Sequence, residues 1–220
     1  NPIIAAFGGT SANPFYGFKP GTVNTAEVGL KTSWTIGDVR GRFNVAAYHQ
    51  DYSDIQRQSS IFDAAGVLIG STIINAASAD IDGFEVEATV RPTSSLQFDA
   101  FYSYSRPKYN EWIVFSGTTA VAVKSSPFAG APRHSGGGSV SWTLPGDEAK
   151  GEMVFSSHAY RQTETYTQDT TISPVTLQPF ATSVLPSYTL VNARFEWNRI
   201  FGTKFSAGAY VRNLFDKYYY

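Results

Sequence analysis

The chain has 220 residues, with 17 Lys and Arg against 18 Asp and Glu, which gives a formal net charge of −1. This balance gives no indication of nucleic-acid binding, and the absence of cysteine excludes disulfides and thiolate metal sites. Aromatic residues make up 15% and charged residues only 16% of the chain, a composition that favours strands over helices. No apolar run is long enough for a transmembrane helix. A transmembrane β-barrel needs none, because its strands alternate lipid-facing and lumen-facing residues.

Apolar and polar residues alternate along much of the chain. In the first such segment, Val28, Leu30 and Ile36 lie on one face and Glu27 and Lys31 on the other. The same period of two recurs in residues 84–90, 96–104 and 191–197. Such alternation is typical of a strand with one apolar and one polar face. About eight long strands are predicted in this way, at 22–37, 40–54, 80–92, 95–106, 133–144, 151–165, 187–198 and 203–214.

The connections between the predicted strands alternate strictly between short and long. Short turns lie at 37–41, 92–95, 145–151 and 199–202, and long links at 55–79, 107–132 and 166–186. Short turns at one rim and long loops at the other are typical of an outer-membrane barrel, with periplasmic turns and extracellular loops. We therefore predict an all-β fold, an antiparallel up-and-down meander whose strands exceed the roughly 9–11 residues that a bilayer crossing needs.

A soluble β-sandwich is the alternative fold, because alternation alone does not say whether the apolar face meets lipid or another sheet. Two features favour the barrel. Charged residues recur on the polar faces, as a wet lumen allows: Glu27, Lys31, Arg42, Glu85, Glu87, Asp99, Arg194, Glu196 and Arg212. Tyr and Trp gather near strand ends, as in an aromatic girdle: Tyr48, Tyr52, Tyr102, Tyr104, Trp142, Tyr160 and Trp197.

Five segments spread over nearly the whole chain resemble the TonB-dependent outer-membrane receptors, in the C-terminal half of their barrel. The segments are KPGTVNTAEVGLKTSW (19–34), RFNVAAYHQDYSDIQ (42–56), NAASADIDGFEVEATVRP (75–92), FAGAPRHSGGGSVSW (128–142) and VRNLFDKYY (211–219). The last is similar to the family's N-L-F-D-x-x-Y signature. Each motif alone is weak, but the five occur in the family's order.

The resemblance implies that the chain is a segment of a 22-stranded transmembrane barrel, a size whose lumen is closed by a plug. Residues 1–220 are expected to form one partial barrel in a Gram-negative outer membrane, crossing it several times. The family's plug domain, its TonB-contacting segment and its last strand are expected to be missing. The chain would then end one strand short of closure, with an unpaired edge at 203–214.

The same resemblance implies energised uptake of a scarce solute, most often a ferric siderophore. The expected partners are outer-membrane lipid, the small-molecule ligand and, through parts of the receptor outside these residues, the TonB complex. No nucleic-acid partner is expected. Two alternatives stay open for the function: a passive porin-like or adhesin-type outer-membrane barrel, and a soluble β-sandwich binding module.

The sequence contains no recognisable catalytic or metal-binding constellation. His49, His134 and His158 are not spaced as metal ligands, so no metal site is predicted. Glu85 and Glu87 share a strand face, where a carboxylate pair could suggest glycoside hydrolysis, but charges that line a wet lumen are the better interpretation. We predict that the protein is not an enzyme and needs no cofactor.

The long links combine aromatic and hydrogen-bonding side chains, a mixture that suits the capture of a siderophore, vitamin or sugar. The candidate ligand-binding residues are Tyr109, Trp112, Phe115, Arg161 and Tyr166. The aromatic residues among them could instead pack the loops against one another, and the sequence leaves both interpretations open.

Overall fold

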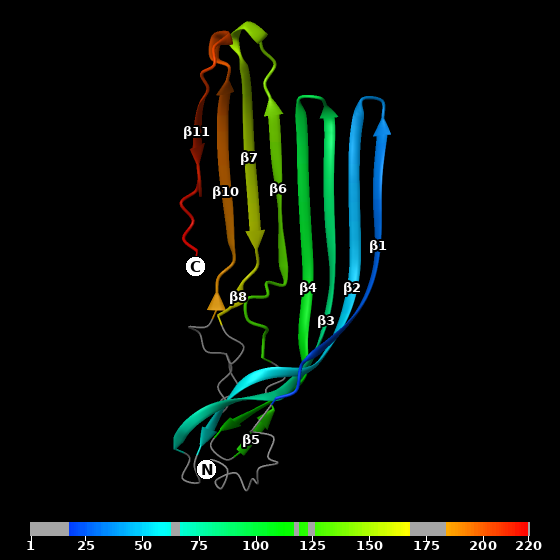
Figure 1. Ribbon diagram of the computed structural model, residues 1–220, viewed down its shortest axis with the longest axis vertical. Coiled ribbons are helices and arrows are strands. Elements are labelled where there is room, and N and C mark those ends of the chain that lie inside the picture. Colours follow the sequence, from blue (N-terminus) through cyan, green and yellow to red (C-terminus); the bar gives the residue numbers. More distant parts are fainter. Residues whose placement is uncertain (1–17, 63–66, 117–118, 123–125, 168–183, 220) are drawn as a thin grey trace.

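A computed structural model describes residues 18–62, 67–116, 119–122, 126–167 and 184–219, which are almost entirely β-strand (Figure 1). The strands are β1 (Thr22–Ile36), β2 (Val39–Phe62), β3 (Leu68–Thr93), β4 (Leu96–Ser116), β5 (Thr119–Ala122), β6 (His134–Thr143), β7 (Glu152–Gln162), β8 (Thr165–Tyr166), β9 (Val184–Leu185), β10 (Tyr188–Asn198) and β11 (Ala207–Val211). The short 3-10 turns are η2 (Glu148–Lys150) and η4 (Ile200–Gly202). None of the helical segments described is long and apolar enough to cross a membrane.

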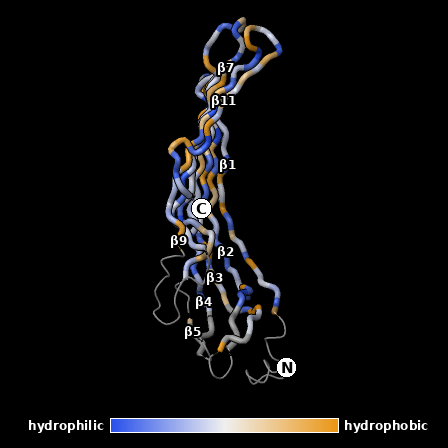
Figure 2. Tube along the Cα trace, turned by 90° about the vertical axis from the view of Figure 1, so that its left-hand side faces the viewer, coloured by the Kyte–Doolittle hydropathy of each residue, from blue (hydrophilic) through white to orange (hydrophobic). Residues whose placement is uncertain are grey.

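The main sheet is an antiparallel meander, as predicted. Its strands pair in the order β1-β2-β3-β4-β6-β7-β10-β11, so that neighbours in the chain are neighbours in space. The short β5 pairs with β4, and β8 pairs with β9. Seen from the side, the described strands form a single layer (Figure 2). Both faces of the sheet are therefore open over most of its length.

The four predicted short turns all lie at one end of the sheet, at the top of Figure 1. The turn from β1 to β2 passes through Gly37, whose φ of 59° lies in the left-handed region that glycine adopts without steric cost. The turn after β10 contains η4, with φ of 52° at both Arg199 and Phe201. The predicted short turns are thus confirmed, and each predicted strand has a counterpart in the main sheet.

The prediction of long links at 55–79 and 107–132 is wrong. β2 and β3 stay paired as far as Phe62 and Leu68, and β4 runs on to Ser116, so most of these residues are strand. The hydrophobic alternation is obscured because bulges at Tyr52/Ile55 and Ser78/Ala79 change its phase. The third predicted link, 166–186, lies largely outside the described residues.

Beyond these bulges, β2, β3 and β4 bend away from the line of the other strands (Figure 1). The buried apolar side chains of the described residues gather in this bent extension: Ile55, Ala77, Ala79, Tyr109 and Trp112. Tyr52 and Phe128 pack against them. The extension thus has a small core of its own, whereas the main sheet does not.

On the main sheet, aromatic rings cover glycines of neighbouring strands. Tyr48 of β2 lies over Gly83 of β3, and a Cβ on Gly83 would overlap the Tyr48 ring. Phe101 of β4 lies over Gly137 of β6, where a Cβ would come within 2.9 Å of the ring. Glycine is required at both positions because the ring occupies the space of a side chain.

The C-terminal strand β11 is shorter than the predicted 203–214 and pairs with β10 alone among the described strands. The N-L-F-D segment that follows is a turn. The Asn213 amide nitrogen donates to the Lys217 carbonyl at 2.9 Å, and the Lys217 backbone N–H donates to Asn213 Oδ1 at 2.8 Å. The backbone N–H of Leu214 still donates to the carbonyl of Val191 at 2.8 Å, so the turn remains fastened to β10.

Candidate functional site

One face of the main sheet is apolar from β1 to β10. Directly opposed residues of neighbouring strands point to the same side of a sheet, and one such row contains Leu30, Val45, Val86 and Tyr102. Many side chains on this face are exposed, among them Val28 at 74%. A continuous exposed apolar surface marks contact with a membrane or a partner. We call it the outward face.

The outward face ends in polar or charged residues at the end of the sheet remote from the short turns. The last apolar or aromatic residues are Ala47 on β2, Phe84 on β3, Tyr104 on β4 and Ala159 on β7. Two positions further along each strand, on the same face, lie His49, Asp82, Arg106 and Arg161. The change occurs on each of these strands, so the apolar face has a defined limit at this end of the sheet. Such a limit is what an interface between hydrocarbon and headgroups requires.

The predicted aromatic girdle is only partly correct. Tyr102, Tyr104, Trp142 and Trp197 lie on the outward face at the two ends of the apolar region, as predicted. Tyr48, Tyr52 and Tyr160 do not. Strand alternation places them on the opposite face, where Tyr160 stacks with Phe101 at 6.3 Å between ring centroids.

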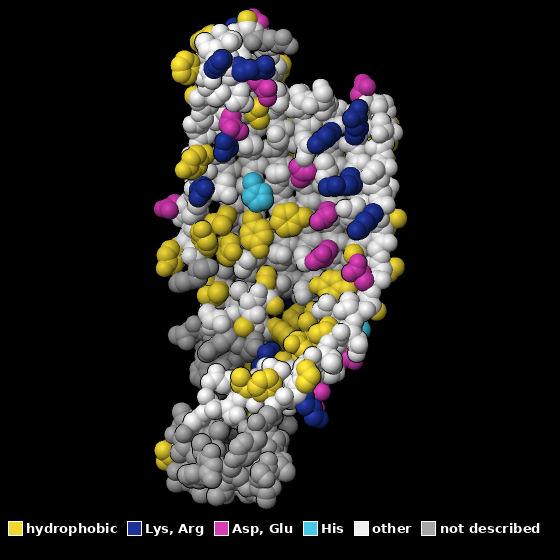
Figure 3. Space-filling model, in the orientation of Figure 1, with side chains coloured by type: hydrophobic (Ala, Val, Ile, Leu, Met, Phe, Trp, Pro, Cys, Tyr) yellow, Lys and Arg dark blue, Asp and Glu magenta, His cyan; other side chains and the backbone are white. Residues whose placement is uncertain are grey.

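The opposite face, which we call the inward face, carries the charges that the sequence predicted for a lumen. Figure 3 shows it: basic and acidic side chains gather towards the turn end of β1–β4, and hydrophobic side chains form a band below them. The basic residues are Lys31, Arg40, Arg42 and Arg91, and the acidic residues are Glu85, Glu87 and Asp99. Towards the turn end of β1–β4, the inward face is therefore polar, in contrast to the outward face.

Neutral donors hold two carboxylates of the inward face, those of Asp99 and Glu87. Asp99 accepts hydrogen bonds from Thr89 Oγ1 at 2.8 Å, Gln97 Nε2 at 2.7 Å and Ser139 Oγ at 3.3 Å. Asn44 donates to Glu87 at 3.1 Å. Because amides and hydroxyls satisfy these acids, the guanidinium groups nearby are not consumed in ion pairs with them.

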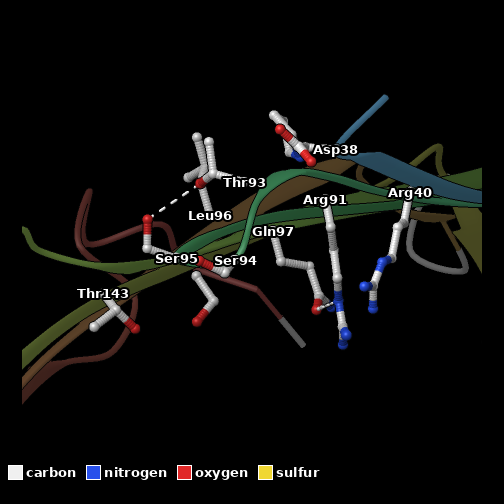
Figure 4. Close-up of a pocket in the computed structure, with 11 residues that line it drawn as sticks. Asp38, Arg40, Arg91, Thr93, Ser94, Ser95, Leu96, Gln97 and Thr143 are labelled. Carbon is white, nitrogen blue, oxygen red and sulfur yellow. Dashed lines mark hydrogen bonds between the residues drawn. The ribbon is translucent and has the colours of Figure 1, made fainter. Parts of the chain in front are cut away.

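A cleft of about 740 Å³ opens at the turn end of the inward face, between the β3–β4 turn and β6 (Figure 4). Arg40 and Arg91 are paired in register and lie side by side along it. Arg91 Nε donates to Gln97 Oε1 at 2.6 Å, and no ion pair between described residues involves either arginine. Two parallel guanidiniums in an open cleft suit an anionic group.

An aromatic row crosses the inward face below the charges. The row begins with Phe101 and Tyr160 and continues through Tyr188 to Tyr219. The ring centroids of Tyr160 and Tyr188 are 6.1 Å apart, and those of Tyr188 and Tyr219 are 5.2 Å apart. Sequence reasoning missed this row. The rings can be assigned to one face only when the register is known, because the register shows which residues of neighbouring strands lie opposite Phe101. Flat rings beside hydrogen-bonding groups suit contact with a planar or conjugated group.

Two of the predicted ligand-binding residues are buried in the bent extension. Tyr109 is 0% and Trp112 2% exposed, with their ring centroids 4.6 Å apart. Phe128 stacks on Tyr109 at 4.1 Å, and the Arg57 guanidinium lies over both the Tyr109 and the Trp112 rings. Phe115 lies on β4, and its side chain is outside the described part of the chain.

The other two predicted residues, Arg161 and Tyr166, lie elsewhere. They line a second cleft, of about 680 Å³, between β4 and the β6–β8 region. Arg161 belongs to the outward face of β7, opposite Gly136, and donates to Thr189 Oγ1 at 3.0 Å. The five candidates therefore do not converge on one site. The described residues also contain no group of three His, Asp or Glu side chains that could hold a metal ion.

A family model described as "TonB dependent receptor-like, beta-barrel" matches residues 1–214. No match was found among curated protein sequences. Solved structures with the same fold include the ferripyoverdine receptor of Pseudomonas aeruginosa, which is 19% identical over 92% of this chain with a TM-score of 0.62. The ferric yersiniabactin uptake receptor FyuA of Yersinia pestis is 18% identical over 89% of the chain with a TM-score of 0.58.

The chain spans only 24% of the length of the first of these receptors and 25% of the second. It therefore corresponds to about a quarter of such a protein. The family match covers nearly all of the chain, and the meander with one apolar and one polar face has the architecture of a barrel wall. This chain belongs to the TonB-dependent receptor family, in the β-barrel part.

Proposed function

We propose that the chain forms part of the wall of an outer-membrane receptor that binds a ferric siderophore and takes it up with energy supplied through TonB. The observation that carries the proposal is the family match over residues 1–214. The names of the similar receptors, for ferripyoverdine, ferric yersiniabactin and ferric preacinetobactin, support an iron complex as the solute. Because the sequence identity to these receptors is low, the similarity supports the fold more strongly than it supports any individual ligand.

The two-faced sheet supports a location in the outer membrane, crossed several times. The outward face would contact lipid and the inward face the lumen, with the short turns in the periplasm. The bent extension would then stand on the extracellular side, where a solute arrives. TonB would act through parts of the receptor beyond these residues.

Ligand contact at Tyr109, Trp112, Phe115, Arg161 and Tyr166 stays a prediction. The burial of Tyr109 and Trp112 favours a supporting role beneath the loops. The inward aromatic row and the Arg40–Arg91 cleft offer exposed groups of the chemistry that a chelator with carboxylates or catecholates would meet.

The test is uptake of iron-55 complexes by cells that carry or lack the gene for the whole receptor, grown under iron limitation. We expect accumulation of one siderophore class to require the gene, TonB and a proton-motive force. Gene-dependent accumulation that survives loss of TonB and addition of a protonophore would show a passive pore instead. Expression that does not respond to iron would count against an iron complex as the solute.

A further inference from the structure

We propose that the cleft around Arg40 and Arg91, at the turn end of the inward face, is a transit site. It holds the anionic oxygens of the solute after the solute has left the extracellular side and before release into the periplasm. The inference rests on the function proposed above and deepens it. It assigns the two arginines to passage through the wall and not to capture.

The guanidinium of Arg91 is held in place by a chain of hydrogen bonds. Arg91 Nε donates to Gln97 Oε1 at 2.6 Å, and Gln97 Nε2 donates to Asp99 Oδ2 at 2.7 Å. Two hydroxyl groups also donate to Asp99, so this carboxylate is fixed as well. Because Gln97 occupies only Nε, the terminal nitrogens of Arg91 stay available to an acceptor in the cleft. Gln97 is therefore a positioning residue for Arg91.

Positive charge exceeds negative charge around the cleft. A smaller cleft of about 310 Å³ shares Arg40 and Arg91 with it and adds Arg42 and Asp99. The other acidic residue is Asp38, whose side chain and the two guanidiniums point to opposite sides of the ribbon in Figure 4. No ion pair between described residues involves Arg40, Arg42 or Arg91. Exposed guanidiniums without acidic partners attract an anion and bind its oxygens in pairs.

Hydroxyl groups line the rest of the cleft. Ser94 and Ser95 belong to the β3–β4 turn, and Ser141 and Thr143 belong to β6. Ser141 lies opposite Gln97 in register and so faces inward. A hydroxyl group both donates and accepts hydrogen bonds, so these residues suit an oxygen-rich ligand. The ligand class is an anionic metal complex of carboxylate or catecholate groups, since a cationic complex would be repelled by the arginines.

The cleft is far from the place where the solute arrives. Gln97 and Tyr109 lie on the same strand, β4, and about 40 Å of strand separates them at roughly 3.3 Å per residue. One small molecule does not contact the cleft and the bent extension at the same time. A solute that reaches the arginines has therefore already left the extension, which makes the cleft a site of transit.

The first experiment measures the attraction of anions to the cleft and needs no solute. Ser141→Cys is introduced into the whole receptor on a cysteine-free background. The rates at which the thiol reacts with anionic sulfonatoethyl and cationic trimethylammonioethyl methanethiosulfonate are compared at low ionic strength. Adding Arg40→Gln and Arg91→Gln should lower the ratio of the anionic to the cationic rate about fivefold or more. Arg40→Lys with Arg91→Lys keeps both charges and should keep the ratio.

The matched control for this experiment carries Lys31→Gln and Lys204→Gln, the same loss of charge outside the cleft. It should leave the ratio unchanged. A thiol at position 141 that neither reagent reaches, an unchanged ratio after Arg40→Gln and Arg91→Gln, or an equal fall in the control would overturn the inference.

The second experiment separates capture from passage. Cells that carry the whole receptor are given the iron-55 complexes ferripyoverdine, ferric yersiniabactin and ferric preacinetobactin. Surface binding is measured on de-energised cells and uptake on energised cells. For a complex that is taken up, Arg40→Gln with Arg91→Gln should lower the maximal uptake rate about fivefold or more and leave the Kd of surface binding unchanged.

A loss of surface binding equal to the loss of uptake would place the arginines in capture and overturn the inference. Normal uptake by the glutamine variant would refute the inference alone. If the unaltered receptor takes up none of the three complexes, the proposed iron complex fails as the solute. The thiol experiment then still decides whether the cleft attracts anions.

Discussion

His49 and Asp82 face each other across β2 and β3, with Nδ1 and Oδ1 2.8 Å apart, at the first position beyond the apolar part of the outward face. The hydrogen bond to Asp82 raises the pKa of His49 above its ordinary value of 6.5. Desolvation opposes this rise, and the negative charges of Asp82, Asp80 and Asp51 add to it. Charged histidine is thus favoured at the edge of the membrane-facing surface.

The first prediction concerns pH. Because the pKa of His49 is raised on folding, protonated His49 stabilises the β2–β3 pairing fully below the unfolded pKa of 6.5, and this contribution is lost as pH rises through the folded value. Asp82→Asn should move the NMR titration of the His49 imidazole to lower pH. An unchanged His49 midpoint would contradict the assignment.

The second prediction tests which face meets lipid. Val86→Arg places a charge in the middle of the outward face of β3 and should cost about 2–4 kcal/mol of folding free energy in a bilayer. Glu85→Arg, one residue away on the inward face, is the matched control and should cost much less. Urea unfolding of the receptor in lipid vesicles measures both. Equal costs would contradict the assignment of the outward face to lipid, and a larger cost for Glu85→Arg would mean that the two faces are assigned the wrong way round.

The third prediction concerns Trp112, which is 2% exposed. Trp112→Ala should cost about 3–5 kcal/mol, because it leaves a cavity in the small core of the extension. Limited proteolysis should then cut the extension first. Trp112→Phe keeps an aromatic ring in the core and should largely preserve both the protection and solute affinity. If Trp112→Phe stays protected but loses the solute, Trp112 contacts the ligand directly.

The fourth prediction concerns the close approach at Gly137. An alanine Cβ there would collide with the Ala159 carbonyl and the Phe101 ring, so Gly137→Ala should destabilise the sheet by about 1–3 kcal/mol. Gly146→Ala is the control, because the nearest atom to its Cβ is 4.0 Å away. Unfolding in vesicles gives both values, and equal stability of the two variants would rule out the proposed crowding.

The sequence predicts the meander and its short turns well because these depend on local alternation and turn residues. It fails at 55–79, where a bulge shifts the phase of β2 and the strand continues with its pattern inverted. The sequence also wrongly assigns Tyr48 and Tyr160 to the girdle. A sequence shows that a residue is near a strand end, but the register of the strands decides which face of the sheet its side chain occupies. The cluster around Tyr109 depends on contacts between distant segments, such as the stacking of Phe128, that no local pattern records.

The ring–glycine pairs have a consequence for how the wall assembles. If one strand slips by one residue against its neighbour, its apolar side chains move to the polar face, so this register is disfavoured. A slip by two residues keeps every side chain on its original face. In that alignment Phe101 would meet Ser135 or Ser139 in place of Gly137, and Tyr48 would meet Ile81 or Glu85 in place of Gly83. Tyr48 and Phe101 thus discriminate between alignments that amphipathicity treats as equal. Two pairs of residues select the stagger of the strands, and with it the tilt and curvature of the barrel wall.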